Sequence, residues 1–150
     1  DQECVLRYVA FTMMPYRTSD LDSFLNEAMV SLNQMSSERR LELAMRFRRV
    51  MVAAHEVFGR EAFRKRYSRG ASRSPINKAL FEAWSVNLDR LNDADLQQLR
   101  LQSASLMEGF IALMNEQDFS DAVSYATGDS RKVTYRFERI QQLIQEVLAQ

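Results

Sequence analysis

Apolar residues recur at intervals of three and four along most of this 150-residue chain. This spacing places side chains on one face of an α-helix, where they can be buried together. Only four glycines and two prolines are present, and no segment alternates apolar and polar residues as a half-buried strand does. The sequence therefore predicts an all-α fold. The clearest stripe consists of Leu21, Phe24, Leu25, Ala28, Met29 and Leu32.

Capping residues divide the first part of the chain into three expected helices. Pro15 ends the first helix, because the residue before a proline avoids the helical conformation. Serine is a favoured N-cap, and glycine a favoured residue just past a helix C-terminus. The three helices are expected over residues 3–14, from Ser19 with Asp22 in its first turn, and from Ser36 or Ser37 to Gly59.

The second part of the chain carries further boundary signals. Ser74 followed by Pro75 is typical of a helix start, and the composition of residues 68–74 is that of a loop. We expect one domain, an irregular bundle of seven or eight helices. The remaining helices are expected over residues 61–67, from Ser74 to Leu91, from Asn92 to about Gln117, from Asp118 or Ser120, and from Ser130 to the C-terminus after a turn at 127–129.

The residue inventory argues against catalysis by this chain. His55 and Cys4 are the only histidine and cysteine, whereas zinc and iron sites draw on several such residues. The four glycines are scattered singly, so no glycine-rich phosphate loop exists. No nucleophile-elbow sequence accompanies His55. We expect no cofactor, no metal, no membrane span and no enzyme activity, in a cytoplasmic protein.

Positive charge is concentrated in residues 39–78, the basic segment, although the net charge of the chain is zero. The basic segment holds twelve Lys or Arg and three acids, and the remaining residues hold eight Lys or Arg and seventeen acids. Such asymmetry can attract polyanions, because Lys and Arg neutralise phosphates. The alternative is that these cations pair with the surplus acids of the same chain. The candidate nucleic-acid-binding residues are Arg60, Arg64, Lys65, Arg66, Arg69, Arg73 and Lys78.

Aromatic residues within and beside the basic segment are expected in the core. Phe63, Tyr67, Phe81 and Trp84 follow helical spacing, which is more typical of buried side chains than of base-stacking platforms.

Several blocks of the sequence resemble the helical C-terminal half of bacterial proteins related to the N-terminal domain of GmrSD-type restriction enzymes. The resemblance covers nearly the whole chain, and the polar residues within its main blocks are Asn77, Lys78, Thr127 and Arg136. The blocks are residues 3–8, 16–26, 56–64, 76–83, 119–123, Thr127 and 133–140.

The resemblance implies a role in defence against phage or foreign modified DNA. Members of that family carry a ParB-like N-terminal part with an Asp-Gly-Gln-Gln-Arg motif, and some add an HNH-type nuclease domain. This chain has no such motif and a single histidine. It is therefore expected to be a non-catalytic part of a larger protein, lacking the ParB-like portion and contributing DNA contact or scaffolding.

Two alternatives stay open at this stage. In the first alternative the chain serves as a protein-interaction or oligomerisation module, either with itself or with another subunit. Thr127 and Arg136 either face a shared site, or Thr127 braces the turn while Arg136 makes a buried ion pair with an acid.

Overall fold

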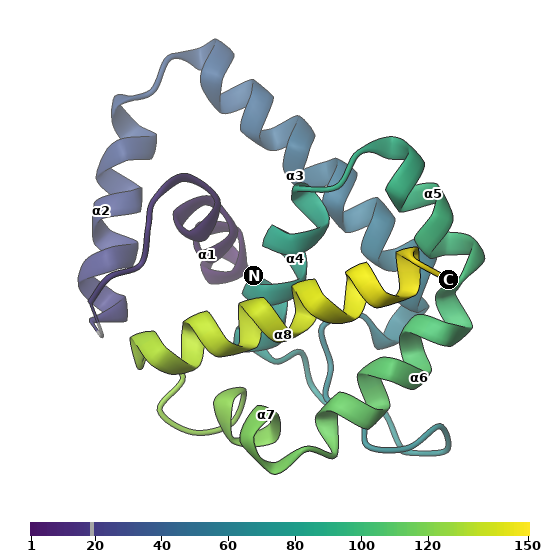
Figure 1. The fold of residues 1–150 in the computed structure, drawn as a ribbon. Helices are drawn as coiled ribbons and strands as arrows, with labels where there is room; N and C mark the ends of the chain where they lie inside the picture. Colours follow the sequence, from purple (N-terminus) through teal and green to yellow (C-terminus); the bar gives the residue numbers. More distant parts are fainter. Residues whose placement is uncertain (19) are drawn as a thin grey trace.

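The computed structural model describes residues 1–18 and 20–150, and these residues fold into one all-α domain (Figure 1). The predicted fold class is thus confirmed. Within the described residues there are eight α-helices and one short 3₁₀ helix. The elements are α1 (Gln2–Met13), α2 (Leu21–Gln34), α3 (Ser37–Phe58), η1 (Gly59–Glu61), α4 (Lys78–Asp89), α5 (Asp93–Leu101), α6 (Ser103–Met114), α7 (Gln117–Ala122) and α8 (Ser130–Leu148).

Helix α4 lies at the centre of the fold. It packs against α1, α3 and α8, and α8 runs across it in Figure 1. Every residue from Ala79 to Leu88 is buried, because α4 is covered on all sides rather than along one stripe. A helix that is apolar nearly all round belongs in a core. Glu82, Ser85 and Asn87 are consequently enclosed with it.

Two apolar clusters fill the interior of the part of the chain that the structure describes. The larger surrounds Trp84, whose ring contacts Phe58 and Phe110 at centroid distances of 4.8 and 5.5 Å. The smaller lies under α1 and α2 and includes Phe11 and Phe24. Phe137 packs against both clusters, so they form one continuous core.

Two of the expected N-caps are replaced by neighbouring aspartates. Ser19 lies outside the described residues, and α2 is capped by Asp20, whose side chain accepts from the Ser23 amide at 3.0 Å. Asp129 rather than Ser130 caps α8, and its carboxylate accepts from the Arg131 amide at 2.8 Å. By contrast, the predicted cap at Ser36 is confirmed.

The helix expected over residues 61–67 is absent. Phe63 adopts a positive φ of 63°, which helices of L-residues do not tolerate. Its ring is buried against Phe81 at 4.7 Å, so burial of the aromatic side chain overrides the local preference. Tyr67, expected inside, is exposed on the loop that follows.

Helix α4 begins later than the Ser74-Pro75 signal predicts. Residues 75–77 are outside any helix, and Ile76 pairs with Arg64 in an isolated antiparallel bridge that leaves its side chain half exposed. Asn77 is the true cap, accepting from the Leu80 amide at 2.8 Å. The long helix expected from Asn92 to Gln117 is also divided at Gln102 into α5 and α6.

Candidate nucleic-acid interface

Residues 60–77 form a closed loop, the basic loop, beside α6 and α7 (Figure 1). The Arg64–Ile76 bridge and a 2.8 Å bond from the Asn77 amide to the Phe63 carbonyl close its base. Asn77 also donates through Nδ2 to the Val123 carbonyl at 2.9 Å. Of the polar residues in the resembling blocks, Asn77 therefore has a structural role, since it caps α4 and ties the base of the loop to the segment after α7.

Arg64 joins the two arms of the basic loop. Its Nε donates to the Arg60 carbonyl at 2.9 Å, and its Nη1 donates to the Ser74 carbonyl at 2.5 Å. Both acceptors are neutral, so the guanidinium charge stays uncompensated. The carbonyls of Arg60 and Ser74 therefore lie on the same guanidinium, that of Arg64. Ser74 follows Arg73 directly in the chain.

The first arm of the loop is held against α7 and its neighbours. Lys65 Nζ donates to Ser124 Oγ at 2.6 Å, another neutral acceptor. Tyr67 and Ser120 share a hydroxyl hydrogen bond of 2.9 Å, and Asn115 donates to the Tyr67 carbonyl at 2.9 Å. The loop is thus fixed in one geometry along much of its length.

Three of the seven candidate cations are neutralised within the chain. Arg66 pairs with Glu61 at 2.9 Å, Arg69 pairs with Glu108, and Lys78 pairs with Glu3. The hydrogen bond from Lys78, with that from Arg7, lowers the pKa of the Glu3 carboxyl. The pairs with Glu108 and Glu3 match the alternative expected from the surplus acids, whereas Glu61 belongs to the basic segment itself.

The other four candidates lack a carboxylate partner among the described residues. Arg60 and Arg73 are exposed, and Arg64 and Lys65 bond only neutral oxygens. The basic loop therefore keeps uncompensated positive charge at Arg60, Arg64, Lys65 and Arg73.

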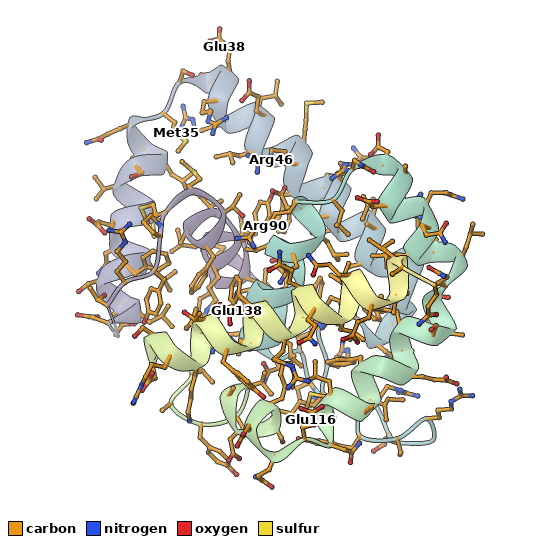
Figure 2. The ribbon with its side chains drawn as sticks, viewed as in Figure 1. Met35, Glu38, Arg46, Arg90, Glu116 and Glu138 are labelled. Carbon is orange, nitrogen blue, oxygen red and sulfur yellow. The ribbon has the colours of Figure 1, made fainter. Side chains whose placement is uncertain are left out.

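The rest of the basic segment does not extend this surface. On α3, Arg39 pairs with Glu42 at 2.8 Å, Arg46 with Asp89 at 2.5 Å and Arg49 with Asp93 at 2.9 Å. Arg46 lies on the upper half of α3, whereas the basic loop lies at the opposite end of the molecule (Figures 1 and 2). The excess charge of residues 39–78 is therefore spread over separate regions.

Arg136 and Thr127 meet in the interior rather than at the surface. Arg136 is fully buried and forms an ion pair with Glu82. It also donates to the carbonyl oxygens of Thr127 at 2.8 Å and Ala122 at 3.2 Å. Of the two alternatives for Arg136, the structure contains the buried ion pair. The main-chain carbonyl of Thr127 accepts one of the hydrogen bonds of the same guanidinium.

The sequence analysis did not identify the other members of this buried group. Arg7 Nη1 lies 3.0 Å from the second carboxylate oxygen of Glu82, so Arg7 and Arg136 hold one carboxylate between them. Burial raises the pKa of Glu82, and the two guanidinium charges oppose that rise. The sequence feature that could have indicated this buried group is Glu82 itself, which is an acid among the apolar residues of α4.

Other classes of site find no support in the described part of the chain. There, no group of three or more His, Cys, Asp or Glu side chains is placed to hold a metal ion. None of the helices described is both long and apolar enough to cross a membrane. No family model, curated protein or solved structure matches the chain.

Proposed function

We propose that this chain is a non-catalytic helical domain of a cytoplasmic prokaryotic defence protein similar to GmrSD-type restriction enzymes. In this proposal the basic loop contacts the phosphates of nucleic acid. The sequence resemblance supports the defence role. Residues 78–83 of one of its blocks lie in α4 and residues 133–140 of another lie in α8, and these two helices pack together around the Glu82–Arg136 pair.

The observation that supports a phosphate contact is the uncompensated positive charge of the basic loop. Arg60, Arg64, Lys65 and Arg73 have no carboxylate partner among the described residues, while their neighbours Arg66 and Arg69 do. An uncompensated guanidinium can bind a phosphate in a bidentate manner, through two parallel N–H···O hydrogen bonds. Because internal hydrogen bonds already order the loop, binding would cost less conformational entropy than with a mobile loop.

Such a contact has a characteristic salt dependence. Each neutralised phosphate contributes about −0.9 to the slope of log affinity against log salt for duplex DNA. Four contacts give a slope of about −3.6, so affinity falls roughly 150-fold between about 50 and 200 mM salt. The contact would not distinguish base sequences, because phosphates carry no sequence information directly.

The test is fluorescence anisotropy with a labelled duplex at low salt. The double variant Arg60→Glu/Arg73→Glu keeps the hydrogen bonds of the Arg64 side chain, because their acceptors are main-chain carbonyls. It should weaken binding by about tenfold or more. The matched control is Arg40→Glu/Arg90→Glu, which changes net charge equally. Both control residues are exposed and form no ion pair within the described residues. The control should bind like the natural chain.

Two results would remove the proposal. One is the absence of binding by the natural chain at about 50 mM salt, where non-specific contacts are strong. The other is an equal loss of affinity in both double variants, which would show a response to net charge rather than to the basic loop.

A further inference from the structure

Two tyrosines at the basic loop and beside it expose their rings. Of the aromatic residues within and beside the basic segment, Phe63, Phe81 and Trp84 are buried, whereas Tyr67 is 44% exposed. Tyr125, in the turn after α7, is 68% exposed. Neither tyrosine ring packs against another aromatic ring among the described residues. Both rings can therefore accept a stacking partner from solvent.

Hydrogen bonds hold both tyrosines in place. The Tyr67 hydroxyl shares a 2.9 Å hydrogen bond with the Ser120 hydroxyl, and the Tyr67 carbonyl accepts from Asn115 Nδ2 at 2.9 Å. The main-chain carbonyl of Tyr125 accepts from Lys132 Nζ at 2.7 Å. Because these contacts exist before any ligand arrives, binding to the rings costs less conformational entropy than binding to mobile side chains.

Lys65 connects the two tyrosines to the uncompensated charge of the basic loop. Its Nζ donates to Ser124 Oγ at 2.6 Å, and Ser124 directly precedes Tyr125 in the chain. Tyr67, two residues after Lys65, bonds Ser120 in the same segment. The side chains of Lys65 and Tyr67 thus both reach the segment that carries Tyr125. We call Lys65, Tyr67 and Tyr125 the tyrosine surface.

The acids of α7 lie beside a different part of the surface. Asp118 and Asp121 line a hollow together with Asp129 and Lys132, and no residue of the tyrosine surface lines that hollow. Lys65 forms no ion pair among the described residues. The tyrosine surface therefore combines exposed aromatic rings with a cation that has no carboxylate partner there.

We propose that the tyrosine surface stacks on the bases of single-stranded nucleic acid while the basic loop binds the phosphates of the same strand. This inference rests on the proposed phosphate contact and adds the class of nucleic acid. Aromatic side chains stack on unpaired bases of any sequence, because every base has a π-face, and a positively charged surface follows the backbone. A duplex keeps its base faces inside the stack, and exposing one costs unstacking and unpairing energy.

Stacking predicts a preference that phosphate contacts alone do not produce. Each phosphate contact releases more counterion on a duplex than on a single strand, so electrostatics alone favours the duplex. Removing an aromatic side chain that stacks on a base weakens binding roughly fivefold to 150-fold. We therefore expect the natural chain to bind oligo(dT) of about 12 nucleotides about fivefold or more tightly than a duplex of the same length at about 50 mM salt.

The test compares two double variants by fluorescence anisotropy with both labelled probes. Tyr67→Ala/Tyr125→Ala removes the rings, and Tyr67→Phe/Tyr125→Phe keeps them. Both variants lose the hydroxyl contact between Tyr67 and Ser120, so they differ only in the aromatic rings. The phenylalanine variant should bind oligo(dT) about fivefold or more tightly than the alanine variant, and the two should bind the duplex equally.

Met45→Ala/Leu101→Ala is the control for loss of exposed apolar surface. Both residues are exposed, and they belong to α3 and α5, which lie apart from α7 (Figure 1). This variant should bind both probes like the natural chain.

Equal affinity of the alanine and phenylalanine variants for oligo(dT) overturns the stacking proposal. An equal difference between these variants on the duplex overturns it as well, because the rings would then act through the shape of the loop. In either case duplex binding by the natural chain leaves the proposed phosphate contact standing. Absence of binding to both probes removes the phosphate contact together with the stacking.

Discussion

Glu82 lies in the core with one guanidinium on each of its carboxylate oxygens, Arg136 on one and Arg7 on the other. Arg7 is shared in turn with Glu3, at 2.8 Å, and Glu3 also pairs with Lys78. The chain of charges therefore links α1, α4 and α8. Removing charges from water is costly, and only close, hydrogen-bonded partners offset that cost. The group should thus be sensitive to the loss of any one charge.

We predict that Glu82→Gln destabilises the fold by about 3 to 5 kcal/mol, the usual cost of leaving a buried charge without its partner. Glutamine keeps the volume of the side chain, so the effect reports charge and hydrogen bonding. The control is Glu116→Gln, which breaks the exposed 2.6 Å pair with Arg139 and should cost at most about 1 kcal/mol. Unfolding in guanidinium chloride measures the loss of unfolding free energy in both variants. Similar losses in the two variants would contradict the prediction.

At the level of residues, prediction from sequence depends on whether a signal is local. The cap at Asn92 was predictable, because its side chain reaches an amide only three residues away, that of Asp95. The partner of Arg136 was not, because Glu82 is 54 positions distant and twenty acids compete for it in the sequence. The same limit applies to Arg69 of the basic loop, whose partner Glu108 lies on α6.

The crossing of α6 and α8 shows how one glycine sets the distance between two helices. A Cβ added at Gly109 would overlap Cδ1 of Leu143 on α8. The sequence showed a glycine in mid-helix without a reason for it, and the close approach of α8 supplies that reason.

We predict that Gly109→Ala is destabilising by about 1 kcal/mol, because overpacking costs about 1 to 3 kcal/mol and outweighs the gain of about 1 kcal/mol in helix propensity. In a Leu143→Ala background the overlap is gone, so the same substitution should stabilise by about 1 kcal/mol. Thermal or urea unfolding of the four proteins completes the double-mutant cycle. An equal effect of Gly109→Ala in both backgrounds would rule out contact with Leu143 as the cause.

The boundaries of elements were predictable where local capping decides them and not where packing does. Ser36 and Gly59 delimit α3 as their residue types suggest. The start of α4 shifts from Ser74 to Lys78 because the main chain before it pairs with Arg64. Likewise, Phe63 gives up helical geometry to pack on Phe81. In each failure, a contact distant in sequence outweighs a local preference.

At the scale of the whole molecule, α4 connects the two apolar clusters. Trp84 belongs to the larger cluster and Val86 to the smaller, although they lie on one helix two residues apart. Phe137 on α8 packs against both. The amphipathic pattern predicted an all-α bundle, but not that one helix would be buried on all sides and join both parts of the core.

We predict that the two clusters unfold together, because neither can lose its packing while α4 and Phe137 stay in place. Trp84 is the only tryptophan, so its fluorescence reports the larger cluster. In a Trp84→Phe background, Tyr16→Trp places a second reporter beside Phe11 and Phe24, which Tyr16 contacts at 5.4 and 4.9 Å. Within each protein, the urea midpoint from fluorescence should equal that from far-ultraviolet circular dichroism. A fluorescence transition at position 16 that precedes loss of helix would show instead that α1 and α2 separate from the rest of the domain as an independent unit.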